Sequence, residues 1–396
     1  MAEDKLLSNT ENQSSKVVSY VNRVLKNGQL YRYEGNSPNQ NDVPILEQEF
    51  SHYVGAKYAV AMNSCGSSLF VSLLCAGIKP GDPVLTSGFT FTAVPSAIVQ
   101  AGGRPKLVEM NEDYGVDIDD LREKITDETK IMVLSHMRGH ASNMSDVTSL
   151  CREYDITLIE DAAHAFGMTW NGAHLGTLGD IGCYSMQSYK LIGAGEGGML
   201  ITNNEHFAAQ AIIYSGCYES LWLGHLSLSK LVENYQDYLP SFSLRMSNLT
   251  AAVIRAKLAD VSQRIKQYRV LYTYFVNQLQ TCQYFRIPER DPRLKIAPNS
   301  IQFTLQNMTE DQQQYFVKLV NANGIKLVLL GDANSRNARC FWNWKYLEEN
   351  PLLPKTKLLL KSLCDMRLTA TSTAEIDQIT TLLISSVETS VKTNGN

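Results

Sequence analysis

The chain has 396 residues, enough for two domains of ordinary size whose core needs neither a disulfide nor a metal. Hydrophobic residues make up 44% of the sequence and charged residues 19%, which is typical of a globular protein that folds in water. A net charge of −4, without a basic cluster, argues against a nucleic-acid or anionic-membrane partner.

Cysteine spacing and the N-terminal composition indicate a reducing compartment. The eight cysteines lie far apart without a C-x-x-C pair, so we expect reduced thiols, mostly in the core, rather than disulfides or a metal site. Residues 1–15 are polar and lack the apolar core of a signal peptide. No run approaches the ~20 apolar residues of a membrane-spanning helix. We therefore expect a cytoplasmic protein with a flexible N-terminal tail.

Taken in chain order, the first half of the sequence predicts helices followed by an alternating pattern. Apolar residues at helical spacing predict helices at 16–26 and 43–55, the second ending at Gly55. Strands and helices then alternate, which predicts an α/β fold with a mostly parallel sheet covered on both faces. The expected strands are 57–63, 82–87, 105–110, 130–136, 156–161, 183–189 and 198–203, and the helices lie near 66–76, 92–101, 117–124 and 145–153.

The second half of the chain predicts a smaller unit. Residues 204–240 are aromatic-rich and irregular, which suits a loop over a site or a partner subunit. A long helix is expected from 246 to 280, with the domain boundary inside it. We therefore divide the chain into a large domain, 1–255, and a smaller α+β domain, 256–396. The smaller domain should contain strands at 300–305 and 325–330 and helices within 311–324 and 373–390.

Two charged residues stand where a ligand of such a sheet would bind. Asp161 ends the apolar strand ITLIED, and Lys190 follows 29 residues later, after the uncharged run CYSMQSY. An amine and an acid placed there suit a pyridine-aldehyde cofactor: the amine forms an imine, and the acid keeps the ring nitrogen protonated. Apolar flanks should lower the pKa of Lys190. Taken singly, Asp161 could instead cap a helix, Lys190 could be a surface lysine, and nearby His164 could be a core histidine.

Other segments could hold such a cofactor. Residues 63–68, NSCGSS, lie where a strand gives way to a helix, so they could form a phosphate site or an ordinary serine cap. Ser185 could add a hydroxyl, and Phe89 or Phe91 could stack on a flat ring or belong to the core. The glycines of 193–198 fit G-x-G-x-x-G, but a strand follows where a dinucleotide site needs a helix. We interpret them as a turn beside the lysine.

Together these segments resemble a known family. The motifs EDAAHAFG, GTLGD, YSMQSYK and GAGEGGMLITN, with KPGDPVLTSGFTFTAVPSAIVQAGGRPKLVEM and RMSNLTAAVIRAKL, are similar in order and spacing to the DegT/DnrJ/EryC1/StrS sugar aminotransferases, over roughly residues 25–385. The resemblance implies pyridoxal 5′-phosphate as cofactor and the fold-type I architecture: a large domain with a mostly parallel mixed sheet flanked by helices, and a smaller α+β C-terminal domain. It also implies a homodimer with shared active sites.

The resemblance also assigns roles to individual residues. Lys190 would be the catalytic lysine that forms the imine with the cofactor. The residues that would bind the cofactor are Asp161 at the ring nitrogen, His164 near the ring hydroxyl, Phe91 on the ring face, and Ser185, Cys65, Gly66 and Ser67 at the phosphate.

The sequence departs from the family pattern in three places. Ser-Cys-Gly-Ser replaces the usual Ser-Gly-Thr, so Ser67 stands in for one hydroxyl. Ser243 occupies the position of an asparagine that reaches the partner subunit's phosphate. Arg138, in HMRGHASNM, replaces an aromatic or aliphatic residue, which favours a substrate with a carboxylate or phosphate. With Arg138, the resemblance assigns Arg245 to the substrate.

The activity implied by the resemblance is a two-stage transamination. An amino acid, expected to be L-glutamate, would leave its nitrogen on the cofactor as pyridoxamine phosphate, and a keto-sugar would then accept it. The product would serve amino-sugar biosynthesis for cell-surface polysaccharide, lipopolysaccharide or a secondary metabolite. An 8-oxo-3-deoxy-octulosonate or a cyclitol ketone are alternative acceptors. Related sugar dehydratases carry histidine in place of Lys190, and a non-catalytic regulator is a further alternative.

Overall fold

The computed structural model describes residues 15–34, 41–225, 227–347 and 351–393, so the tail predicted for residues 1–15 lies outside the described residues except for Ser15. A seven-stranded sheet in the order β1-β9-β8-β5-β4-β2-β3 forms the larger part of the fold. Neighbours from β8 to β3 pair in parallel, whereas β9 pairs antiparallel with β8 and β1. The predicted mostly parallel mixed sheet is therefore confirmed. Its strands are β1 (Tyr58–Met62), β2 (Pro83–Ser87), β3 (Arg104–Val108), β4 (Ile131–Ser135), β5 (Thr157–Asp161), β8 (Ile181–Ser185) and β9 (Gly198–Thr202).

Helices cover both faces of this sheet because its strands are apolar on both sides. In β9, Met199 and Ile201 pack into one core and Leu200 into the other, as the period of two in a strand requires. The first core includes α3 (Asp42–Val54), α7 (Met144–Glu153) and α10 (Asn248–Leu258), and the second includes α4 (Cys65–Cys75), α5 (Ala93–Gln100) and α8 (Glu205–Gly216). Helix α2 (Ser15–Asn27) packs on α10, and α6 (Ile118–Lys124) packs on α7.

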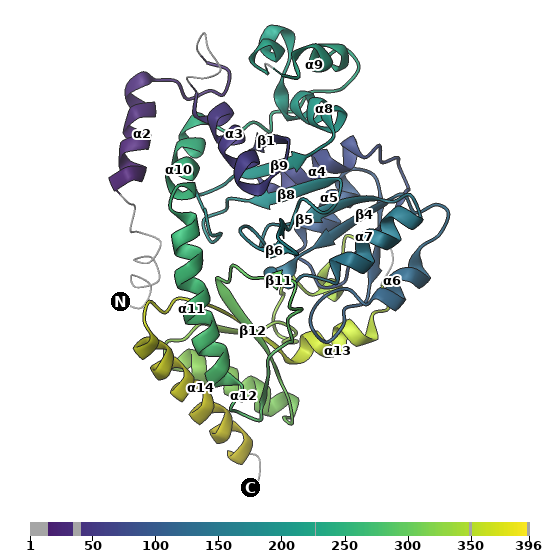
Figure 1. The fold of residues 1–396 in the computed structure, drawn as a ribbon. Helices are drawn as coiled ribbons and strands as arrows, with labels where there is room; N and C mark the ends of the chain where they lie inside the picture. The colour runs from purple at the N-terminus through teal and green to yellow at the C-terminus, as the bar shows by residue number, and fades with distance from the viewer. Residues whose placement is uncertain (1–14, 35–40, 226, 348–350, 394–396) are drawn as a thin grey trace.

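A second, antiparallel sheet forms the C-terminal unit, in the order β10-β12-β14-β13. Its core gathers Phe275, Phe303, Phe316 and Ile376. Figure 1 shows α11 running from the large sheet to this unit, where α12 and α14 lie. The elements are α11 (Val261–Leu279), β10 (Phe285–Arg286), β12 (Ser300–Leu305), α12 (Glu310–Ala322), β13 (Leu327–Leu329), α13 (Pro354–Ser362), β14 (Leu363–Arg367) and α14 (Thr373–Thr393).

Apolar packing and a small sheet are among the contacts that join the two units. Leu330, Leu360 and Leu363 pack against Phe89 and Tyr114 of the large unit. A three-stranded sheet, β11-β6-β7, pairs β11 (Leu294–Lys295) with the hairpin β6 (Thr169–Trp170) and β7 (Ala173–His174). These contacts hold the C-terminal unit against the edge of the large sheet where strands β2, β4 and β5 end.

Two predictions of local structure are wrong. The single helix expected over 246–280 is two helices, α10 and α11. Asp260, which lies between them, adopts φ −112° and ψ 5°, and this conformation interrupts the helical backbone. The irregular loop expected over 204–240 is mostly helical, with α8, the 3₁₀ helix η3 (Glu219–Gly224) and α9 (Ser229–Tyr235). Helix α8 was missed because all residues of 208–216 except Gln210 are buried, so the helix shows no continuous polar stripe.

Other predictions have clear outcomes. All eight cysteines are free and seven are buried, as expected. Gly55 ends α3 with φ 77°, and its amide donates a hydrogen bond to the Ser51 carbonyl, as expected for a helix C-cap. Within the described residues, no helix combines the length and apolarity needed to cross a membrane. The boundary proposed at residue 255 lies within α10 and stays a prediction.

Candidate functional site

Strand register brings several of the predicted site residues to one edge of the large sheet. Ser135 at the end of β4 lies opposite Asp161 at the end of β5. Ser185 at the end of β8 and Met62 at the end of β1 both lie opposite Gly198. The chain that leaves Met62 enters α4 three residues later. Asp161, Ser185 and the start of α4 therefore share the edge where ligands of α/β sheets bind.

Asp161 is a fixed, buried acid. Its side chain is 4% exposed, and Oδ2 accepts a hydrogen bond of 2.7 Å from Ser135 Oγ. Oδ1 accepts from the Ala163 amide at 3.1 Å. Each carboxylate oxygen has further lone pairs, so Asp161 can still accept a hydrogen bond from a protonated ring nitrogen.

Lys190 lies in a tight turn beyond β8. Its amide donates to the Gln187 carbonyl at 2.8 Å, and its carbonyl accepts from the Gly193 amide at 2.9 Å. A Cβ at Gly193 would lie 2.4 Å from the Ser188 carbonyl oxygen, so only glycine fits this turn. Gly195 has φ +91°, a left-handed conformation. The glycine run is therefore a turn beside the lysine, as predicted from the sequence.

The environment of Lys190 favours its neutral amine. Burial lowers the pKa of Lys190 to about 8, and the positive charges of Arg138 and Arg367 also lower it. The negative charge of Asp161 acts in the opposite direction, which places this acid within electrostatic range of the amine. Burial also raises the pKa of the Cys65 thiol, so this cysteine stays protonated at neutral pH.

Helix α4 presents its N-terminus to the same edge. Ser64 caps the helix by accepting from the Ser67 amide at 3.0 Å, and Ser67 Oγ donates to Asn63 Oδ1 at 2.6 Å. The amides of Cys65 and Gly66 belong to the first turn, where helical partners are missing. A Cβ at Gly66 would meet only Ser64 Oγ, at 3.7 Å, so space is open above this helix end. An anion can bind there.

Close packing holds α4 in this position. A Cβ at Gly198 would lie 2.2 Å from the Ser64 carbonyl oxygen and 2.6 Å from the Cys65 amide nitrogen. The helix end therefore rests directly on the first residue of β9. Ser185, 8% exposed, lies opposite Gly198, and its Oγ accepts from the Gln187 amide at 3.3 Å.

The two phenylalanines after β2 have different environments. Phe89 is 1% exposed and packs edge-on against Tyr114 in the core. Phe91 is 40% exposed, and the Arg339 guanidinium lies 5.7 Å from the centre of its ring. Of the two, Phe91 is the ring that a ligand could reach.

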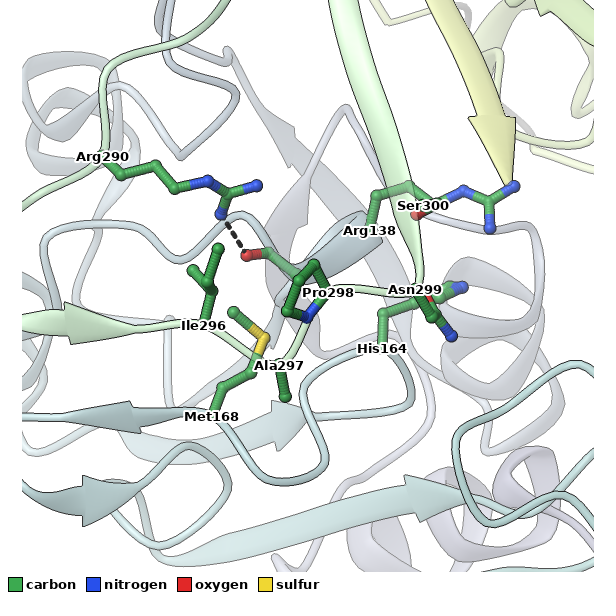
Figure 2. Close-up of a pocket in the computed structure, with 10 residues that line it drawn as sticks. Arg138, His164, Met168, Arg290, Ile296, Ala297, Pro298, Asn299 and Ser300 are labelled. Carbon is green, nitrogen blue, oxygen red and sulfur yellow. Dashed lines mark hydrogen bonds between the residues drawn. The ribbon is translucent and has the colours of Figure 1, made fainter. Parts of the chain in front are cut away.

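His164 lies three residues after Asp161 in sequence and lines a cavity with Arg138, Arg290 and residues 296–300. Figure 2 shows Arg290 donating to the Gly139 carbonyl at one end of this cavity, with His164 and Asn299 at the other in this view. Burial lowers the pKa of His164, and the charges of Lys190 and Arg138 lower it further. His164 is therefore neutral at neutral pH.

Arg138 and Arg245, the two residues assigned to substrate, both make contacts within the chain. Arg138, at φ 55° in the 3₁₀ helix η2 (Met137–Gly139), donates from Nη2 to Asp365 in a buried ion pair. Arg245 Nη1 donates to the Gly216 carbonyl at 2.8 Å, and Nη2 donates to Ser243 Oγ at 3.4 Å. Ser243 is exposed and lies two residues before Arg245, which forms a β-bridge with Met62 at the end of β1.

Sequence reasoning missed three charged residues of this region, Asp365, Arg367 and Arg339. Strand β14 alternates, with Cys364 and Met366 in the C-terminal core and Asp365 and Arg367 on the opposite face. This period of two was a usable signal in LCDMRL. Arg339 lies in an irregular segment with no motif, so only the fold reveals it.

The donors at this edge fit pyridoxal 5′-phosphate. The open N-terminus of α4 suits a phosphate, a buried carboxylate on β5 suits a protonated pyridine nitrogen, and a lysine with a pKa of about 8 suits an aldehyde. Asp161, Ser185 and the start of α4 share one edge of the sheet, and Lys190 lies five residues beyond Ser185, so we expect one small ring to reach all of them.

Comparisons with known proteins agree with this arrangement. The model of the DegT/DnrJ/EryC1/StrS aminotransferase family matches residues 12–371. The chain is 32% identical to GDP-perosamine synthase of Vibrio cholerae over 59% of this chain and 61% of that protein. It is 33% identical to spore coat polysaccharide biosynthesis protein SpsC of Bacillus subtilis over 53% of this chain and 54% of that protein. The chain thus matches less than two thirds of the length of these relatives.

The fold is also shared with solved structures. The crystal structure of 3-amino-5-hydroxybenzoic acid synthase superposes with a TM-score of 0.83, covering 96% of this chain and 98% of that chain at 21% identity. The fold-type I architecture expected from the sequence is therefore confirmed.

Proposed function

The chain belongs to the DegT/DnrJ/EryC1/StrS aminotransferase family, and on this premise we propose that it moves an amino group from an amino acid, L-glutamate, to a keto-sugar with the help of pyridoxal 5′-phosphate. The observation that carries the proposal is Lys190, whose pKa falls to about 8 within electrostatic range of the buried Asp161. A sugar dehydratase would not need this lysine. The matches to a GDP-perosamine synthase and to a spore coat polysaccharide protein support a sugar as acceptor.

The proposed cofactor site uses the donors already described. The phosphate would accept from the Cys65 and Gly66 amides and from the Ser67 and Ser185 hydroxyls. Asp161 would pair with the ring nitrogen, Phe91 would lie on the ring face and His164 near the ring hydroxyl. Ser243 would reach the phosphate of the partner subunit in a homodimer. The homodimer and a cytoplasmic location stay predictions.

When bound, the cofactor supplies a cationic ring that accepts the electron pair left as a C–H bond breaks. Lys190 Nζ would be the base that removes the α-proton of the amino acid and the acid that delivers this proton to the exocyclic carbon of the cofactor. Its pKa of about 8 lets it act in both directions near neutral pH. Ser135 Oγ and the Ala163 amide hold the Asp161 carboxylate in place, and a carboxylate at the ring nitrogen favours the protonated form of that nitrogen.

The acceptor that we consider first is a nucleotide-linked keto-hexose, with an 8-oxo-3-deoxy-octulosonate and a cyclitol ketone as alternatives. In each case the product is an amino sugar or amino cyclitol, for a cell-surface polysaccharide, lipopolysaccharide or secondary metabolite. The proton shuttle at Lys190 is the same for all three.

The test is the donor half-reaction. Purified holoenzyme is mixed with glutamate without an acceptor, and 2-oxoglutarate is counted while the cofactor spectrum is followed. We expect one 2-oxoglutarate per active site, with loss of the visible absorbance. Lys190→Ala should form none, whereas Lys295→Ala, at an exposed position of β11, should behave as the native enzyme. A spectrum unchanged by glutamate and by other amino acids would favour the non-catalytic regulator instead.

A further inference from the structure

Three arginines from separate parts of the chain meet beside the proposed site. Arg138 follows β4, Arg339 lies between β13 and α13, and Arg367 ends β14. Each lowers the pKa of His164 together with Lys190, so all three lie within electrostatic range of that histidine. We name Arg138, Arg339 and Arg367 the arginine cluster.

Asp365 lies among these arginines, and both oxygens of its carboxylate already accept hydrogen bonds from other side chains. Oδ2 accepts from Arg138 Nη2, and Oδ1 accepts from Gln302 Nε2 at 2.8 Å. Asp365 is 4% exposed, so it forms a buried pair with Arg138. Its single negative charge faces three guanidinium groups.

The other two arginines border residues of the proposed cofactor site. Arg367 Nη1 donates to the Tyr189 carbonyl at 3.1 Å, directly before Lys190, and its guanidinium lies 4.5 Å from the centre of the Tyr189 ring. Arg339 lies over Phe91 and has a 3.4 Å hydrogen bond to Asn337. The cluster therefore lies next to the reacting end of the site.

The cluster carries more positive charge than its surroundings neutralise. Burial and repulsion from Arg138 and Arg367 together lower the pKa of Arg339 to about 10. Within the described part of the chain, the Nε atoms of Arg138 and Arg339 are buried without a hydrogen-bond partner. Buried cations and unpaired donors are costly unless an anion meets them. This arrangement favours the binding of an anion.

We propose that the arginine cluster binds a carboxylate of the keto-sugar, and that the acceptor is consequently a sugar acid rather than a neutral sugar unit carried on a nucleotide. This inference rests on the proposed aminotransferase function. Planar guanidinium groups match a carboxylate through paired N–H donors. The neighbouring cavity is lined by Arg290 as well as Arg138, so an anion bound there would meet further positive charge.

The test compares matched acceptors on enzyme that already carries the amino group. Holoenzyme is charged with glutamate and freed of it by gel filtration, and then offered 8-oxo-3-deoxy-octulosonate, 5-keto-gluconate, the methyl ester of each, and a UDP-linked 4-keto-hexose. We expect an acid to exceed its own ester in kcat/KM by about 10-fold or more, because the ester lacks the charge that the cluster binds.

Variants assign this preference to the cluster. Arg339→Gln and Arg367→Gln should reduce the preference for acid over ester about 10- to 100-fold through KM, and Arg339→Lys should restore part of it. Arg293→Gln is the matched control, because Arg293 also lies 4.5 Å from an aromatic ring, that of Trp170, outside the cluster. Arg293→Gln should keep the native preference.

Three results would overturn the proposal. In the first, esters react as well as acids. In the second, the variants slow only the glutamate half-reaction, which would assign the cluster to the donor carboxylate. In the third, the native enzyme prefers the nucleotide-linked sugar and the same variants lose that preference, which would assign the cluster to a phosphate. Calorimetry of the same acid and ester pairs on the holoenzyme measures the preference without turnover. A failure of amino transfer is thereby separated from a failure of carboxylate recognition.

Discussion

Lys190 should react with pyridoxal 5′-phosphate with an apparent pKa near 8, because burial disfavours its ammonium form more than Asp161 favours it. The difference from the ordinary lysine value of 10.5 corresponds to about 3 kcal/mol. Near pH 7 it leaves about 300-fold more free amine than an exposed lysine has.

The assay mixes apoenzyme with the cofactor over a range of pH and follows the visible absorbance by stopped flow. Only the free amine attacks the aldehyde, so the rate should rise about tenfold per pH unit and level off near pH 8. Asp161→Asn removes a charge that raises the pKa of Lys190, so the midpoint should move to lower pH by about 1 unit or more. Asp180→Asn is the control, since Asp180 accepts from the Leu158 amide at the opposite end of the sheet.

A midpoint near 10.5 in the native enzyme would refute the reasoning, because it would mean that water reaches Lys190 freely. An upward shift in Asp161→Asn would refute it as well, since it would mean that Asp161 does not act on this amine.

The remaining predictions concern the fold around the site. Asp365→Ala should lower the free energy of unfolding of the apoenzyme by about 3–5 kcal/mol, because it leaves Arg138 buried and unpaired; an unchanged urea midpoint would contradict this. Gly198→Ala should weaken cofactor binding at least about tenfold by displacing the N-terminus of α4, whereas Gly224→Ala, with open space around it, should not; equal affinities in a fluorescence titration would count against the phosphate site. Phe91→Ala should weaken cofactor binding about 2- to 12-fold through lost ring stacking, and an unaltered dissociation constant would exclude this contact.

Much of the large unit could be predicted because its signals are local. Strands such as β4 (IMVLS) and the first part of β5 (TLIED) are runs of apolar residues, so they can be recognised without knowledge of their neighbours. Asp161 and Lys190 were found for the same reason, since each directly follows such a strand or run. The Asn171–Gly172 turn of β6 and β7, with φ 48° and 86°, was an available hairpin signal that the sequence analysis did not use.

The rest depended on tertiary contacts. Asp365 and Arg367 lie about 175 residues from Lys190 in sequence. The alternation in LCDMR could indicate a strand, but it does not show that this strand, β14, pairs with β12 and β13 or that its charged face lies near Lys190. Arg138 was singled out from the sequence as a residue for the substrate, but its buried partner Asp365 could not be foreseen. The break at Asp260 carries neither glycine nor proline, so the sequence read as one helix.

The most direct measurement of the central claim follows the nitrogen itself. Holoenzyme would be given ¹⁵N-labelled glutamate with the panel of keto-sugars, and the products would be examined by mass spectrometry. Transfer through Lys190 predicts an amino sugar that carries ¹⁵N with the native enzyme and none with Lys190→Ala. A labelled amino sugar formed at the native rate by Lys190→Ala, or a sugar product without nitrogen from the native enzyme, would contradict the account.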